Sequence, residues 1–186
     1  MKQLFQRELT SDEFLIYNKV IHSLKETTST LIKELDNLIN DYKPNNRFES
    51  SFYLDKTNLS IEEKIEYLKC LKEKISKMME CQSIRIKVAN PLHPMCWCYY
   101  LTKYFEKKNN LKLKNFFESK IMHGFCVPYY PSKPIMIANY VFKHGECELH
   151  QILAHELTHS LMNAKDYNAD TYDKAINDAW TLCFLF

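Results

Sequence analysis

The amino-acid sequence predicts an α+β protein that is mostly helical, with one small sheet and an N-terminal helical hairpin. Apolar residues recur at the three- and four-residue spacing of amphipathic helices through most of the first 80 residues. Residues 84–88 and 135–142 instead have the pattern of short strands. Of the 186 residues, 46% are hydrophobic, which is enough for a core. We expect a helical region over 1–82 and a mixed region over 83–186, joined in one compact unit.

The first predicted helix begins at Thr10, which forms a capping-box pattern with Glu13. The apolar positions that follow predict one long amphipathic helix, or two end to end. The stretch Lys-Pro-Asn-Asn-Arg at 43–47 ends it, because proline disfavours helical geometry in the preceding residue and asparagine favours turns. These apolar positions are Phe14, Tyr17, Val20, Ile21, Leu24, Leu31, Leu35, Leu38 and Tyr42.

The second predicted helix begins at Ser60, which repeats the capping box with Glu63. Its apolar stripe lies opposite a face rich in lysine and glutamate, which we interpret as a solvated face. The two helices predict a hairpin covering roughly the first 80 residues. The stripe of the second helix comprises Ile61, Ile65, Leu68, Leu71, Ile75 and Met78.

After residue 83 the period changes from helix to strand. Residues 84–88 alternate between apolar and basic side chains, which predicts a half-buried strand. Pro91 and Pro94 interrupt the chain before the aromatic segment 95–105, which predicts a buried helix followed by a loop rich in lysine and asparagine.

The C-terminal third predicts a loop, a strand and two helices. The loop contains Tyr129, Tyr130, Pro131 and Pro134, and the strand covers 135–142. Gly145 offers a turn before a helix over 147–161. A final helix is expected from about Tyr167 to the C-terminus, with an apolar face formed by Tyr172, Ala175, Ile176, Ala179, Trp180 and Cys183.

Composition excludes several classes of protein. A formal net charge of +2 is too small for a dedicated nucleic-acid binder, so we expect no nucleic-acid partner. Two glycines leave no glycine-rich phosphate loop and no dinucleotide-binding fingerprint. No apolar stretch is long enough to span a membrane. The N-terminal residues lack the apolar core of a signal peptide, so we expect a cytoplasmic protein or one secreted by a signal-peptide-independent route.

The seven cysteines are odd in number and lack the spacing of a disulfide framework, which favours reduced thiols. His93, Cys96 and Cys98 are a weak candidate for a zinc site, because a Cys-x-Cys pair without a second pair is not specific.

The strongest motif is His-Glu-Leu-Thr-His at 155–159, an HExxH pattern on a predicted helix. Imidazoles four residues apart project from one helix face, so His155 and His159 can bind one zinc ion. In this motif the adjacent Glu156 is the general base. The alternative is two surface histidines beside a glutamate that forms a salt bridge.

A catalytic zinc needs a third protein ligand and an open position for water. No glutamate and no histidine follows His159, which leaves aspartate. On a helical projection, Asp166, Asp170 and Asp173 lie along one flank, whereas Asp178 points elsewhere. Either Asp166 or Asp170 is the expected third ligand, and the other would hydrogen-bond a ligating histidine. These acids would equally favour a helix N-terminus electrostatically.

Over about residues 129–186, these segments resemble the zinc proteases whose third ligand is aspartate. This aspzincin group contains deuterolysin and the lysine-specific metalloendopeptidases, and bacterial effector proteases are more distant relatives. Residues 134–142 and 152–160 resemble the edge strand and active-site helix of the group. Asn-Ala-Lys-Asp at 163–166 resembles its Gly-Thr-x-Asp turn, which implies Asp166 as ligand.

The same resemblance implies a zincin-like fold and peptide-bond hydrolysis. Residues 168–172 resemble a later Asn-Ala-Asp motif that shapes a pocket for a lysine side chain. Ala169 stands where the group has a tyrosine, and Tyr167 and Tyr172 are the nearest substitutes.

These observations predict a zinc-dependent endopeptidase acting on a protein or peptide, such as a secreted bacterial effector or toxin. Glu156 would take a proton from a zinc-activated water and pass it to the leaving amine, and Tyr172 or Tyr167 would stabilise the oxyanion. The acidic flank would favour a lysine or arginine after the scissile bond. The alternatives are a non-catalytic module stabilised by zinc, and a zinc hydrolase of a non-protein amide or ester.

Overall fold

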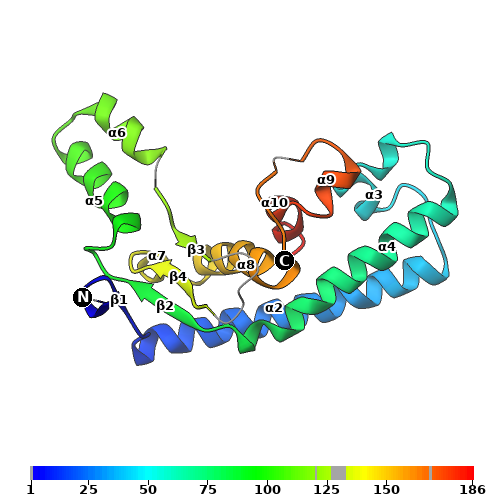
Figure 1. The fold of residues 1–186 in the computed structure, drawn as a ribbon, viewed down its shortest axis with the longest axis horizontal. Helices are drawn as coiled ribbons and strands as arrows, with labels where there is room; N and C mark the ends of the chain where they lie inside the picture. Colours follow the sequence, from blue (N-terminus) through cyan, green and yellow to red (C-terminus); the bar gives the residue numbers. More distant parts are fainter. Residues whose placement is uncertain (1, 120, 127–132, 168) are drawn as a thin grey trace.

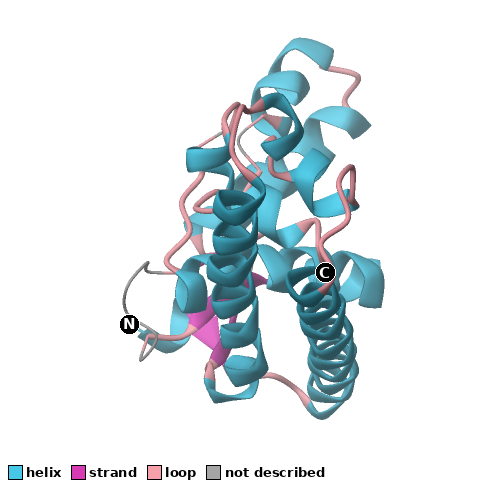
Figure 2. Cartoon of the chain, turned by 90° about the vertical axis from the view of Figure 1, so that its right-hand side faces the viewer, coloured by secondary structure: helices cyan, strands magenta, loops and turns pink. Residues whose placement is uncertain are grey.

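The computed structural model describes residues 2–119, 121–126, 133–167 and 169–186. Helices form most of the chain, and the short strands lie together in one sheet (Figure 2). The predicted α+β class is confirmed at this coarse level. No helix in the described part of the chain is long and apolar enough to cross a membrane.

The two predicted capping boxes begin α2 and α4. Helix α2 is one continuous helix, Ser11–Asn40, and α4 covers Ile61–Ser76. At each N-terminus the capping hydroxyl accepts from the backbone of the glutamate three residues later, whose carboxylate accepts in return. With 30 residues, α2 is about 45 Å long. Helix α4 runs antiparallel along the C-terminal half of α2 (Figure 1), which is the predicted hairpin.

The connection between α2 and α4 consists of α3, Arg47–Ser51, and a 3-10 turn, Leu54–Lys56. It carries a carboxylate, Glu49, that is 1% exposed. Lys64 Nζ lies 2.8 Å from its Oε1, and the Tyr42 hydroxyl and the Asn45 N–H also donate to it. Burial alone would raise the pKa of Glu49, but these three donors lower it overall.

We expect Glu49→Gln to lower the free energy of unfolding by about 1–3 kcal/mol at pH 7, because a buried amide cannot accept from all three donors. Since the folded-state pKa is depressed, this stability is present above the unfolded pKa and is lost as the pH falls through the folded one. Urea unfolding of both proteins at pH 7 and at acid pH measures the difference. An equal difference at both pH values would contradict the prediction.

The central strands of the sheet are β2, Ile86–Ala89, and β4, Ile135–Ala138, which pair in parallel from Ile86↔Ile135 to Ala89↔Ala138. Strand β1, Gln6–Arg7, is antiparallel at one edge, and β3, Gly124–Phe125, is antiparallel at the other.

The expectation of an edge strand at 134–142 is therefore wrong in position and in length. Strand β4 has β2 on one side and β3 on the other, and all its residues are buried. The chain leaves the sheet after Ala138 and forms α7, Val141–His144. The edge strand next to β4 is instead β3, whose two residues are too few to show a strand pattern in the sequence.

Helix α8, Glu146–Met162, matches the predicted helix closely. It packs against α2 and against the 3-10 segment Lys77–Ser83 that follows α4. The buried apolar side chains form one cluster from Tyr17 to Leu182, and β1 of the N-terminal region pairs with β2. The predicted regions 1–82 and 83–186 thus share a core.

Helices α5, Pro94–Lys107, and α6, Leu111–Glu118, form a second helical hairpin that extends from the body (Figure 1). We call residues 94–118 the arm. Two expectations fail here: the aromatic helix is exposed along one side, and the expected loop after it is α6. The reason is that α5 packs mainly on α6, with Phe105 stacked on Phe117 at 5.4 Å, and not beneath a further layer.

The expected continuous helix from Tyr167 is also wrong. The chain is irregular over 163–171 and then forms two short helices, α9, Tyr172–Ala175, and α10, Ala179–Cys183. The break falls at Asp178, whose carboxylate caps α10 by accepting from Thr181 N–H at 2.8 Å. The expected loop residues Tyr129, Tyr130 and Pro131 lie outside the described residues.

Candidate metal centre

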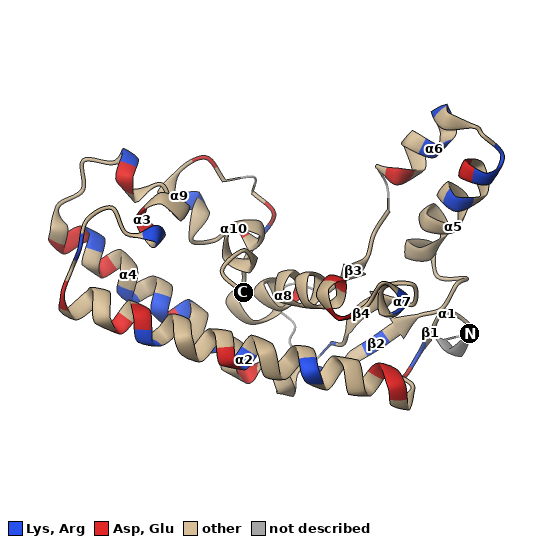
Figure 3. Ribbon diagram, turned by 180° about the vertical axis from the view of Figure 1, so that it is seen from behind, with Lys and Arg blue, Asp and Glu red and all other residues tan. Residues whose placement is uncertain are grey.

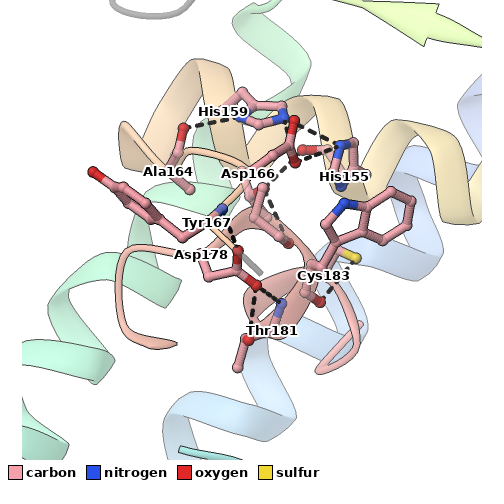
Figure 4. Close-up of polar contacts among 11 residues, drawn as sticks. His155, His159, Ala164, Asp166, Tyr167, Asp178, Thr181 and Cys183 are labelled. Atoms are coloured by element: carbon pink, nitrogen blue, oxygen red, sulfur yellow. Dashed lines mark hydrogen bonds and ion pairs between the residues drawn. The ribbon is translucent and has the colours of Figure 1, made fainter. Parts of the chain in front are cut away.

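Helix α8 brings His155 and His159 together on one face, with their Nε2 atoms 3.1 Å apart (Figure 4). Asp166 Oδ1 lies 3.5 Å from each of these nitrogens. Among the described residues, these three form a group whose potential ligand atoms all lie within 4.8 Å of one another. The structure therefore places Asp166, and not Asp170, beside the two histidines of the HExxH motif.

The end of α8 explains how Asp166 reaches the histidines. The helix stops at Met162, and its C-cap Asn163 adopts the left-handed conformation, with φ 54° and ψ 32°. Asparagine tolerates this conformation better than most residues, so the chain can reverse there. Ala164 then lies beside His159, and its carbonyl accepts a hydrogen bond from His159 Nδ1 at 2.9 Å. Two residues later, Asp166 faces both imidazoles.

The turn that carries Asp166 is held from its other side by residues 177–179. Lys165 N–H donates to Asn177 O at 2.9 Å, and Ala179 N–H donates to Lys165 O at 2.9 Å. Tyr167 N–H donates to Asp178 Oδ1 at 2.8 Å. The Asp166 side chain is 58% exposed, so these backbone contacts, and not burial, position its carboxylate.

Asp178 is a site residue that the sequence reasoning missed, because the expected continuous helix pointed it elsewhere. It is 1% exposed and links Tyr167 to the N-terminus of α10. We expect Asp178→Ala to weaken zinc binding by roughly tenfold, since supporting groups around a metal site contribute on this scale. Chelator competition measures the affinity. Exposed Asp173→Ala is the matched control, and equal affinities in the two variants would contradict the role of Asp178.

The geometry of the cluster fits a zinc ion. Two imidazoles and a carboxylate are a common ligand set for zinc, and ligands at 2.0–2.1 Å in a tetrahedron lie roughly 3.3 Å apart. The three observed separations, 3.1, 3.5 and 3.5 Å, lie close to that edge length.

The hydrogen bond of His159 and the environment of His155 bear on this fit in different ways. His159 Nδ1 donates to Ala164 O, so in the neutral ring the lone pair on Nε2 faces the cluster. His155 Nδ1 is buried and has no hydrogen-bond partner among the described residues. Burial lowers the pKa of His155, helped by His159 and opposed by Asp166, which favours the neutral ring that binds a metal.

Glu156 lies beside the cluster and is 7% exposed. Burial raises the pKa of Glu156 to about 7, although His159 and a hydrogen bond with Cys126 oppose the shift. Burial of the Cys126 thiol, together with the charge of Glu156, raises the pKa of Cys126 to about 12. Strand β3 comes close to Glu156 because of Gly124, where an added Cβ would lie 2.9 Å from Ile152 Cγ2 and 3.2 Å from Glu156 Cγ.

An open cleft of about 610 Å³ lies along α8 next to these residues. Its lining includes Gly124 of β3, Glu148 and Gln151 of α8, His155, Glu156, and Trp180 of α10. The Trp180 ring lies 4.1 Å from the His155 ring. Cys126 and Trp180, like Asp178, were missed because they belong to no motif, and only the chain path brings them to α8.

Three other expected site residues lie apart from the cluster. Asp170 is exposed and pairs with Lys174 at 2.8 Å. Tyr172 packs on Tyr67 of α4, with 6.1 Å between the ring centroids, because α9 turns toward the helical hairpin. Figure 4 shows the phenol of Tyr167 directed away from the imidazoles. The expected oxyanion roles of both tyrosines and the ligand role of Asp170 thus gain no support.

The weak candidate at His93, Cys96 and Cys98 forms no metal-binding group among the described residues. His93 caps α5, and Cys96 is buried against Ala89 O. All seven cysteines are unpaired.

No family model, curated protein or solved structure matches this chain. The 168–172 motif begins at Asn168, which lies outside the described residues. The aspzincin resemblance therefore rests on the motifs quoted above.

Proposed function

We propose that this protein is a zinc-dependent endopeptidase. The observation that carries the proposal is the convergence of His155, His159 and Asp166 beside the buried carboxylate of Glu156, with His155 and Glu156 lining an open cleft. Three protein ligands leave a fourth position free, which distinguishes catalytic zinc sites from structural ones.

In this proposal Glu156 moves the proton. A zinc ion held by the three ligands would lower the pKa of a water molecule and polarise the scissile carbonyl. Glu156 accepts the proton of the attacking water and delivers it to the nitrogen of the leaving amine. Burial raises the pKa of the Glu156 carboxylate, which strengthens it as a proton acceptor.

The cleft favours a peptide over a small amide as substrate. Among the described residues β3 is one of the two edge strands of the sheet, and its Gly124 lines the cleft beside Glu156. An extended peptide can pair with such an edge through its backbone. The acids expected to select a basic side chain, Asp170 and Asp173, do not line this cleft, so the proposal includes no such preference.

The test combines metal analysis with a degradation assay. Purified protein supplied with zinc is incubated with a diverse peptide library, and products are identified by mass spectrometry. We expect cleavage that a chelator stops and that added zinc restores. A protein that binds zinc and loses thermal stability with chelator but cleaves no peptide would support the non-catalytic alternative. Hydrolysis of small amides or esters without peptide cleavage would support the other alternative.

A further inference from the structure

The arm exposes an unusual share of apolar surface. Among the described residues, eight of the seventeen exposed large hydrophobic side chains lie between Leu92 and Met122. Single exposed apolar residues are normal, but their concentration in one segment marks an interaction surface. The six within the arm are Trp97, Leu101, Tyr104, Leu111, Leu113 and Phe116.

On α5 these residues form one continuous stripe. Trp97, Leu101 and Tyr104 follow at spacings of four and three, so they share one helix face. They are 54%, 37% and 56% exposed. The contact of Phe105 with Phe117 and the buried Thr102 lie on the flank of α5 next to this stripe. The stripe therefore remains free after the hairpin has formed its own interior.

Positive charge accompanies this stripe. The arm contains five lysines and two glutamates, whereas the whole chain has a net charge of only +2. Lys103 and Lys114 pair with the glutamates. Lys107, Lys108 and Lys112 make no ion pair with any described residue. They lie at the end of α5 and the start of α6, and Figure 3 shows basic residues at this turn, at the far end of the arm.

We propose that the arm docks on the surface of an anionic lipid bilayer. A helix with Trp, Leu and Tyr along one face and lysines beside them is typical of segments that lie in the membrane interface. The aromatic and aliphatic side chains enter the headgroup region, and the lysines contact the anionic headgroups. The lysine charges select a bilayer surface over an apolar protein groove. This inference is independent of the metal site.

Vesicle co-sedimentation of the full chain tests the proposal. One set of vesicles contains phosphatidylcholine alone, and the other contains phosphatidylcholine mixed with phosphatidylserine. We expect binding to the anionic vesicles, weaker binding as salt is raised, and little binding to the neutral ones. In a Trp180→Phe background, fluorescence reports Trp97 alone, and its emission should shift to the blue when anionic vesicles are added.

Paired variants distinguish binding through the arm from non-specific binding of the protein to vesicles. Leu101→Ser with Tyr104→Ser, and Lys107→Gln with Lys112→Gln, should each weaken binding by about tenfold or more. The matched controls on α2 are Phe14→Ser with Leu15→Ser, which are also exposed, and Lys19→Gln with Lys33→Gln. They should bind like wild type.

Three results would overturn the proposal. The first is wild type that does not sediment with anionic vesicles. The second is an equal loss of vesicle binding in the arm variants and the control variants. The third is a concentration-dependent dimer in analytical ultracentrifugation, lost in the arm variants, without vesicle binding. That result would make the arm a contact between two copies of this chain.

Discussion

Glu156→Gln should abolish peptide hydrolysis while the protein keeps its zinc. Glutamine has nearly the same shape as the buried glutamate, but its amide cannot accept the proton of the attacking water. Loss of a general base costs about 10²–10⁴-fold in rate. Because Glu156 is beside the three ligands and not one of them, metal content should remain near that of wild type.

The assay measures cleavage of the best peptide from the library under saturating substrate, together with zinc per chain. Asp170→Asn is the matched control, since this exposed carboxylate pairs with Lys174 and lies outside the cluster. It should retain activity and metal. A Glu156→Gln variant with full proteolysis would show that the proposed mechanism is wrong.

The second large effect is loss of the metal from His159→Ala and Asp166→Asn. Each variant removes one of the three converging ligand atoms, so we expect the zinc affinity to fall by more than about 100-fold. Wild type should contain about one zinc per chain, as a single three-ligand group implies. Asp170→Asn should match wild type, although its carboxylate is only four residues from Asp166.

Elemental analysis measures the metal content. Thermal unfolding with and without zinc measures how much zinc binding stabilises the folded protein. A ligand that binds only the folded state raises the stability as its concentration rises above Kd. Wild type should therefore gain stability with zinc, and the two ligand variants should not. Wild type that stays metal-free and unchanged in stability when zinc is supplied would reduce the HExxH motif to a chance helix pattern. A protein that does not bind zinc is therefore distinguishable from a protein that binds zinc but does not hydrolyse peptides.

Local patterns were sufficient for the helices that define the body of the fold. The capping boxes at Thr10 and Ser60 begin α2 and α4 as predicted, because both partners of each box are three residues apart in the chain. The helix over 147–161 and the shared face of His155 and His159 follow from helix geometry in the same way.

Patterns were misleading where contacts between distant segments decide the structure. The aromatic residues of 95–105 indicated a buried helix, yet α5 projects with α6 and leaves the stripe exposed. The apolar period after Tyr167 indicated one helix, because Ala175, Ala179 and Cys183 keep helical spacing across the break. The break itself depends on Asp178, which bonds across to Tyr167.

The sequence by itself determined the helix that carries His155, Glu156 and His159, and it limited the third ligand to an aspartate. It could not choose between Asp166 and Asp170, because the two lie on the same flank of a helical projection, four residues apart. The tertiary structure places Asp166 beside the two histidines, since Asn163 reverses the chain and residues 177–179 hold the turn against α8. Those contacts join segments that are separate in the sequence. The sequence pattern of each segment does not indicate that it contacts the other.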